Sequence, residues 1–196
     1  SLFSGMVIAV NAAYHLTTGL VPDMYVGGIV GEAVLIELSP MLTALVMTGK
    51  IGATIAAELG TMRVSEQIDA LESLSFDPIS YLILPRILAA ILIFPILIIF
   101  SDLFGILGGL FVAMHSMDVT YFEFLRGLRM WFRPWDAWFG IIKGIFCGIA
   151  ITSIGCYKGY YTTGGANGVG KATTSTVVVS CISVLFLNYL LGALLL

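Results

Sequence analysis

Four charged side chains stand inside long apolar stretches of the sequence, where they could bind an ion or a polar head group: Glu32, Glu37, Asp102 and Lys143. A charge in a membrane-spanning segment costs free energy and usually serves a function. Glu37 stands mid-segment, three residues before Pro40, which lacks a backbone N–H. Lys143 is expected to pair with Glu37 or with an anionic head group, and either role places both residues in a polar cavity. Glu32 and Asp102 can equally lie near helix ends, where a carboxylate reaches water.

No catalytic or metal-binding motif accompanies these charges. His15 and His115 are isolated, and the three cysteines lack the CxxC spacing of a redox or zinc site. Residues 165–172, GANGVGKA, match the phosphate-loop pattern as far as Lys171 but then have Ala172 where a hydroxyl must bind Mg²⁺. We interpret residues 158–171 as a flexible loop, and we expect no catalytic residue, metal site or cofactor in this chain.

The composition excludes an ordinary water-soluble domain. Of the 196 residues, 59% are hydrophobic and 11% are charged, whereas roughly a quarter of the residues in a soluble domain are charged. The mean hydropathy is +1.02. The nine Lys and Arg residues are scattered over a chain of net charge −3, so no basic tract indicates nucleic-acid binding.

Apolar stretches of about 20 residues, the length that crosses a bilayer, occur four times. We predict an all-α polytopic fold with a single membrane domain over residues 1–196 and complete spans at 24–58, 82–114, 137–158 and 172–196. Residues 1–17 are apolar but short, and we interpret them as the end of a first span. The parent protein would then have five spans.

The segment at residues 65–76 has the pattern of a short amphipathic helix outside the bilayer. Apolar residues at three-residue spacing form a ridge: Ile68, Leu71 and Leu74. Acidic residues form a second stripe: Glu66, Asp69 and Glu72. Ser65 is the expected N-cap, and Asp77 with Pro78 is the expected stop. A helix held tightly between two spans suits a partner's groove and the transmission of motion.

Residues 118–136 have a different character. Apolar residues recur at the same spacing: Phe122, Leu125 and Leu128. Arginines fall on a different face: Arg126, Arg129 and Arg133. All three tryptophans lie in or beside this segment, as is typical of a membrane interface: Trp131, Trp135 and Trp138. We expect one or two helices at the membrane surface, broken at Pro134.

Several motifs, in this order along the chain, resemble the MlaE family of ABC-transporter permeases. They are ELSPMLTA from Glu37, TGKIGATIAAELGTM from Thr48, SEQIDALE from Ser65, DP at 77–78, PR at 85–86 and KATTSTVV from Lys171. The resemblance runs over essentially all 196 residues, and its central block is highly specific.

The resemblance implies a non-catalytic permease subunit, working as a homodimer in the bacterial inner membrane or, as the second choice, in the plastid inner envelope. The implied partners are a cytoplasmic ABC ATPase that binds the ATP and Mg²⁺, and a periplasmic MCE-domain protein. Some members also have a STAS-domain partner. The implied process is the transport of phospholipid between membranes, which maintains lipid asymmetry.

The resemblance also assigns roles to residues. The family's coupling helix maps onto residues 65–74, so the ATPase contacts are expected at Ser65, Glu66, Gln67, Asp69, Ala70, Leu71 and Glu72. The lipid cavity is expected near Glu37, together with Pro40 and Lys143. This chain has Ile36 where the family often has arginine and Asn188 where it can have aspartate. Both changes remove charge from the cavity region.

Motion of the coupling helix is expected to reach the second and third spans through Gly49, Gly52 and Pro85, because glycines let moving helices pack closely. Two other classes of function stay open. An ion-coupled transporter or channel would use Glu37 and Lys143, with Asp102, as a relay, but it predicts an internal repeat that the segments lack. A membrane enzyme acting on lipid would need a nucleophile and a base brought together from distant helices.

Overall fold

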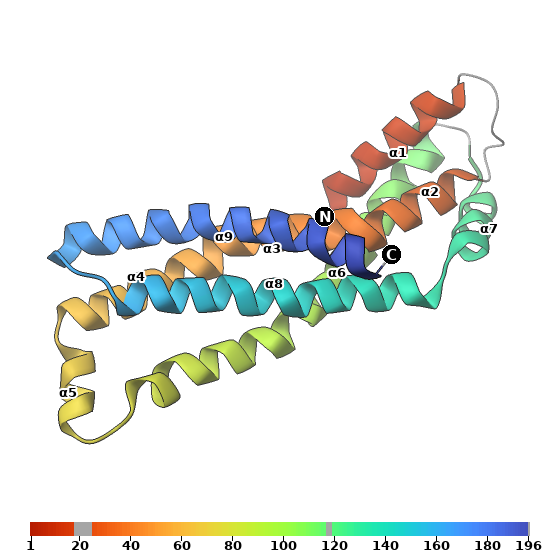
Figure 1. Cartoon of the computed structure of the whole chain (residues 1–196). Coiled ribbons are helices and arrows are strands. Elements are labelled where there is room, and N and C mark those ends of the chain that lie inside the picture. Colours follow the sequence, from red (N-terminus) through yellow and green to blue (C-terminus); the bar gives the residue numbers. More distant parts are fainter. Residues whose placement is uncertain (18–24, 117–118, 196) are drawn as a thin grey trace. The chain divides into compact units, whose positions relative to one another are not determined.

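The computed structural model describes residues 1–17, 25–116 and 119–195, without the side chains at 13–17 and 116. Every element within the described ranges is a helix (Figure 1). Four helical stretches are long and apolar enough to cross a membrane: Tyr25–Val64, Ile79–His115, Pro134–Tyr160 and Gly165–Leu195. These stretches confirm the predicted all-α polytopic membrane fold.

The chain divides into two compact units. Unit 1 comprises Ser1–Thr43 and Pro95–Ile142, and unit 2 comprises Ala44–Phe94 and Lys143–Leu196. Helices α6 (Leu84–Ser116) and α8 (Pro134–Tyr160) each begin in one unit and end in the other. Each unit has its own buried apolar cluster.

Unit 1 is packed through glycines on its helices. A Cβ at Gly27 of α2 (Tyr25–Ala33) would overlap the backbone carbonyl of Phe124 in α7 (Tyr121–Trp131). A Cβ at Gly5 of α1 (Leu2–Thr17) would likewise overlap the carbonyl of Gly105 in α6. Small residues allow backbones to approach this closely within a membrane protein. The cluster that results is built around Phe124, whose side chain is completely buried.

The apolar face predicted for α7 is only partly the face that packs. Leu125 and Leu128 are half-buried, and Leu128 lies against a glycine of α2, but Phe122 is 77% exposed. The fully buried residues are Phe124 and Gly127. The physical reason lies on another helix, because the glycines of α2 lie against both the backbone of Phe124 and the side chain of Leu128. The start of α7 is fixed by a capping box between Thr120 and Glu123. The predicted break at Pro134 is present, since α8 begins at that proline.

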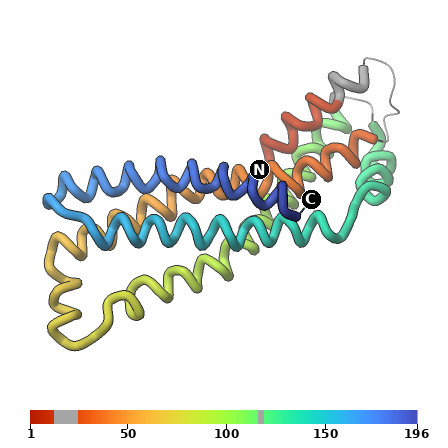
Figure 2. The backbone as a smooth tube through the Cα atoms, viewed as in Figure 1, coloured from red at the N-terminus to blue at the C-terminus, as the bar shows by residue number. Residues whose placement is uncertain are grey.

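Unit 2 contains α4 (Ala53–Val64), the second half of α8 and α9 (Gly165–Leu195), which run side by side (Figure 2). A Cβ at Gly155 would lie 3.1 Å from the backbone oxygen of Gly52, and one at Gly159 would lie 2.8 Å from the Cβ of Leu59. Leu59 and Ile151 are completely buried in this unit. Close helix approach at glycines therefore organises unit 2 as well.

Three short π-helical segments interrupt the long helices. Segment η1 (Val34–Leu38) precedes α3 (Ser39–Met47), η2 (Thr48–Gly52) precedes α4, and η3 (Ile79–Ile83) precedes α6. Segments η1 and η3 each end two residues before a proline, Pro40 and Pro85. A proline removes one helical hydrogen bond and crowds the preceding turn, and a wider turn relieves both effects.

The connection between α8 and α9 is much shorter than the loop predicted at residues 158–171. Helix α8 ends at Tyr160 and α9 begins at Gly165, so the phosphate-loop-like residues form the first turns of α9. Gly164 and Gly165 have φ angles of 91° and 66°, a left-handed conformation that favours glycine. Packing overrides the low helix propensity of the remaining glycines, because Val169 lies against Gly60 of α4.

Candidate functional site

The short helix α5 (Gln67–Ser73) connects α4 to η3 at one end of unit 2. Ile68 is completely buried and Leu71 is half-buried, but Leu74 lies beyond the helix and is 68% exposed. The predicted ridge of three apolar residues is therefore wrong at its last member. One fully buried side chain is a small apolar anchor for a helix.

The residues before α5 end the preceding helix and do not cap α5. The Ser65 hydroxyl donates a hydrogen bond to the backbone oxygen of Thr61, at 2.8 Å, so Ser65 closes α4. Glu66 then adopts a left-handed conformation with φ of 60°, and α5 begins at Gln67. The sequence prediction of Ser65 as an N-cap is therefore wrong, because a serine can bond either backward or forward.

The predicted stop at Asp77 also has another role. α5 ends at Ser73, and Ser75 turns the chain with φ of 63°. The Asp77 carboxylate accepts hydrogen bonds from the Ser80 hydroxyl at 2.6 Å and from the backbone N–H of Ile79 at 3.2 Å, which fixes the start of η3. These bonds, that from Ser80 foremost, lower the pKa of Asp77 below its ordinary value.

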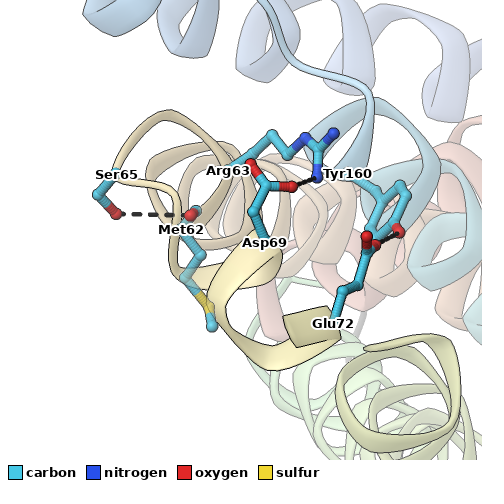
Figure 3. A network of polar contacts seen from close by, with 6 residues as sticks. All are labelled: Met62, Arg63, Ser65, Asp69, Glu72 and Tyr160. Atoms are coloured by element: carbon cyan, nitrogen blue, oxygen red, sulfur yellow. Dashed lines mark hydrogen bonds and ion pairs between the residues drawn. The ribbon is translucent and has the colours of Figure 1, made fainter. Parts of the chain in front are cut away.

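Polar contacts fasten α5 to its neighbours (Figure 3). Nη1 of Arg63, in α4, lies 2.6 Å from Oδ1 of Asp69, and the Tyr160 hydroxyl, at the end of α8, donates to Oε1 of Glu72 at 3.1 Å. The Arg63 guanidinium also lies 5.7 Å from the centre of the Tyr160 ring, within cation–π range. We call these four residues, Arg63, Asp69, Glu72 and Tyr160, the α5 latch.

The latch changes the interpretation of the acidic stripe. Two of its three carboxylates bond to residues of this chain, so they hold α5 in place. The surface that α5 offers outward includes Gln67 and Ala70, which are exposed, and the exposed apolar side chains of Leu74 and Phe76 just after it. This end of unit 2 therefore offers apolar side chains for contact with a partner protein.

Arg63 and Tyr160 are the site residues that sequence reasoning missed. Tyr160 lies 88 residues from its partner Glu72 along the chain, and nothing local in the sequence links the two. Arg63 stands six residues before Asp69, outside the helical spacing of three or four residues that predicts side-chain pairs. The turn at Ser65 and Glu66 brings this pair together.

The intramembrane residues predicted for a polar cavity lie in different units. Glu37 is exposed within η1 and Pro40 is buried, both in unit 1. Lys143, in unit 2, is buried, and its Nζ donates a hydrogen bond to the side-chain oxygen of Asn188 at 2.7 Å. Asn188 is thus a partner that the sequence did not identify for Lys143, while a pairing with Glu37 stays a prediction.

The interpretation of Asp102 as a residue near a helix end is wrong. It lies well inside α6, and its side chain is buried. Oδ1 of Asp102 and the Ser39 hydroxyl, also buried, have no hydrogen-bond partner among the described residues. Glu32 is exposed.

The three residues expected to transmit motion differ in their surroundings. A Cβ at Gly49 would meet no atom within 4 Å, so close packing is not the reason for glycine there. A Cβ at Gly52 would lie 3.2 Å from Cγ2 of Ile151, which is a tight approach. Pro85 is exposed in the first turn of α6, directly after η3. Of the two glycines, only Gly52 has the close helix packing that the proposed transmission of motion requires.

Comparison with known proteins gives a consistent result over the whole chain. The family model described as Permease MlaE matches residues 1–194. A "Probable ABC transporter permease protein" of Rickettsia prowazekii (strain Madrid E) is 41% identical over 191 residues, covering 97% of this chain and 73% of the relative. One of Synechocystis sp. (strain ATCC 27184 / PCC 6803 / Kazusa) is 39% identical over 195 residues, covering 97% and 72%.

A plant protein is similar over the same region. "Protein TRIGALACTOSYLDIACYLGLYCEROL 1, chloroplastic" of Arabidopsis thaliana is 37% identical over 194 residues, covering 98% of this chain and 55% of the plant protein. The family match and these identities confirm the resemblance found in the sequence motifs. This chain, a multi-pass membrane protein, belongs to the MlaE permease family.

Proposed function

We propose that this chain is the non-catalytic membrane subunit of an ABC transporter that moves phospholipid. It would act as a homodimer with a cytoplasmic ATPase, which binds the ATP and Mg²⁺, so that this chain itself needs no cofactor. An MCE-domain protein would carry the lipid on the periplasmic side, and a STAS-domain protein would join some assemblies. The proposed location is the bacterial inner membrane, with the plastid inner envelope as the second choice.

The observation that carries this proposal is the α5 latch. A loop helix with one buried apolar residue would move independently of the spans unless other contacts held it. The Arg63–Asp69 pair ties α5 to α4, and the Tyr160–Glu72 bond ties it to α8. A push on α5 would therefore displace two membrane helices together, as coupling to an ATPase requires.

The coupling contact is proposed at the outward surface of this end. Ser65, Glu66, Gln67 and Ala70 are exposed and Leu71 is half-buried, so an ATPase could reach most of the predicted segment. The exposed apolar side chains of Leu74 and Phe76 extend that surface. From there, motion would pass to α4 through Gly52 and to α6 through η3 and Pro85.

On the substrate side, we propose that Glu37, Pro40 and Lys143 contribute to the lipid cavity. Glu37 lies in a π-helical segment of a candidate span, and such segments are frequent at functional sites. The part-buried hydrogen bond from Lys143 to Asn188 holds a polar group inside the membrane region. One relative is named for a lipid, trigalactosyldiacylglycerol, which supports a lipid substrate class.

The decisive experiment breaks the latch in the complete transporter. The protein in its full natural chain is co-purified with its ATPase and reconstituted into vesicles, and ATP-dependent movement of fluorescent phospholipid to the MCE protein is measured. Asp69→Lys with Glu72→Lys should reduce transport to background, because the lysine introduced at position 69 would repel Arg63 and Tyr160 would lose its acceptor. The unfolding temperature should fall by only a few degrees, since exposed ion pairs are worth about 1 kcal/mol or less.

Lys171→Glu serves as the matched control, because Lys171 is exposed on α9 and lies outside the latch. It should transport at the level of the unmodified protein. Full transport by the Asp69→Lys, Glu72→Lys variant would contradict the proposed role of α5. Transport that follows an ion gradient and ignores ATP would instead support the ion-coupled alternative.

A further inference from the structure

A hollow in unit 2 lies outside both the latch and the proposed lipid cavity. Its volume is about 340 Å³, which falls within the ordinary range of small-molecule sites. Its lining comes from η2, α4 and the start of α6: Lys50, Ile51, Thr54, Ile55, Glu58 and Arg86. Lys50, Thr54 and Glu58 follow one another at four-residue spacing, so the polar groups line one side of the helix.

The hollow carries an excess of positive charge. Nη2 of Arg86 lies 3.1 Å from Oε2 of Glu58, and this ion pair leaves the charge of Lys50 as the surplus. Lys50 is exposed and the Arg86 side chain is 24% exposed, so both cations present accessible donors. A charge-assisted hydrogen bond to an incoming acceptor oxygen is stronger than a neutral one. The Thr54 hydroxyl donates to the backbone oxygen of Lys50 at 2.6 Å, so the cations are the available donors.

Apolar side chains share the hollow with these charges. Ile51 and Ile55 line it together with Lys50 and Arg86. A fully hydrated inorganic ion gains nothing from apolar lining, whereas an amphiphile can place its charged end on the cations and its hydrocarbon on the isoleucines. The chemistry of the lining therefore favours an anionic amphiphile.

The position of the hollow along the helices places it toward one face of the membrane. The stretch Tyr25–Val64 has 40 residues, about 60 Å of helix, whereas the hydrocarbon core is about 30 Å thick. Arg86 lies near the start of the candidate span Ile79–His115, and the long side chain of Lys50 can extend toward the same interface. Basic pockets between membrane helices are a known type of site for anionic lipid head groups.

We propose that this hollow binds the phosphate-bearing head group of a membrane lipid, with Lys50 and Arg86 contacting the phosphate. The bound lipid would belong to the leaflet beside the α5 end, and it would be held there as a ligand. The proposal needs only that the chain spans a membrane, so it does not rest on the proposed transport function. Glu58 orients Arg86, and the isoleucines accommodate the glycerol and upper acyl region.

The test measures lipid binding directly. The protein in its full natural chain is placed in nanodiscs of a phosphate-free glycolipid, digalactosyldiacylglycerol, with increasing fractions of phosphatidylglycerol. Native mass spectrometry then counts the phosphatidylglycerol released with the protein. Lys50→Gln should weaken binding about fivefold, the effect expected for one basic side chain near a membrane surface. Lys50→Arg should restore binding, and Lys171→Gln should bind like the unmodified protein.

Three outcomes would overturn the proposal. Equal binding by Lys50→Gln and the unmodified protein would show that Lys50 does not contact the lipid. Displacement of phosphatidylglycerol by an equal concentration of inorganic phosphate would identify a site for the free ion. A Lys50→Gln variant that changes the monomer–dimer equilibrium in phosphate-free nanodiscs would show that a second copy of the chain covers the hollow. An inactive transporter with normal lipid binding would contradict the proposed function alone.

Discussion

Helices α5 and α7 are both short connections between long helices, but they are held by different forces. α7 buries the ring of Phe124 in the apolar cluster of unit 1, its backbone lies against Gly27 of α2, and a capping box fixes its start. α5 has one buried apolar residue, and it depends on an ion pair and a tyrosine hydrogen bond. Apolar packing fixes an element firmly, whereas exposed polar contacts hold it in a way that a partner can alter. The molecule therefore combines a structural connection at α7 with an adjustable one at α5.

The largest expected effect comes from removing the anchor of α7. Phe124→Ala should lower the free energy of unfolding by about 3–5 kcal/mol, because it deletes a fully buried ring and leaves a cavity. Thermal unfolding of the detergent-purified protein measures this change. The matched variant Phe122→Ala removes a ring that is mostly exposed and should have little effect. If the two variants are equally stable, the packing face assigned to α7 is wrong.

A second test adds volume at the contact between α2 and α7. Gly27→Ala should cost about 1–3 kcal/mol of unfolding free energy, because the new Cβ would overlap the carbonyl of Phe124 and force the helices apart. Gly49→Ala is the control, since a Cβ there meets no atom within 4 Å. Gly49→Ala should be neutral or slightly stabilising, by up to about 1 kcal/mol, because alanine favours helix. A larger loss of unfolding free energy in Gly49→Ala than in Gly27→Ala would contradict the assigned contact between α2 and α7.

The extent to which the sequence predicts this structure differs between the two connections. Length and hydropathy identify the membrane helices, because an uninterrupted apolar run has few alternatives in a bilayer. The apolar face of α7 is predicted only in part: Leu125 and Leu128 are half-buried as expected, but Phe122 is exposed and Phe124 is buried in its place. The choice depends on glycines of α2, which no local pattern of α7 reports. The latch is not predictable, because Tyr160 meets Glu72 only after the chain has folded. Motif resemblance located α5 as the candidate site without revealing what holds it.

A smaller effect is expected when one bond of the latch is removed. Tyr160→Phe deletes the hydroxyl that donates to Glu72 but retains the ring beside Arg63. The loss of stability should be on the order of 1 kcal/mol or less, while the ATPase-coupled transport rate should fall. Tyr161→Phe is the control, because its hydroxyl lies outside the latch and its ring contacts with Tyr157 and Tyr160 are retained. A normal transport rate in Tyr160→Phe would show that Arg63 and Asp69 alone hold α5.

The smallest predicted effect is the pH dependence of the hydrogen bonds that Asp77 accepts, just after α5. The folded structure lowers the pKa of Asp77, chiefly through the Ser80 hydroxyl, so its stabilising contribution is present above the ordinary value of 3.8. That contribution is lost as the pH falls through the lowered pKa. The protection factors of the Ile79 and Ser80 amides, which correct for the slower intrinsic exchange in acid, should therefore fall in strong acid and stay high at neutral pH. Asp77→Asn should exchange faster at neutral pH, and an unchanged rate there would contradict this role.

The central claim is that the ATPase binds at α5 and not at α7. Site-specific cross-linking tests this claim most directly. A photoreactive amino acid replaces Leu74 beside α5 or, as the matched position, Phe122 on α7; both native side chains are largely exposed. The complete transporter is irradiated with and without ATP, and the cross-linked products are identified by mass spectrometry. We expect the position-74 probe to capture the ATPase, with a yield that changes on ATP addition, and the position-122 probe to capture none. Capture of the ATPase from position 122, with none from position 74, would contradict the account.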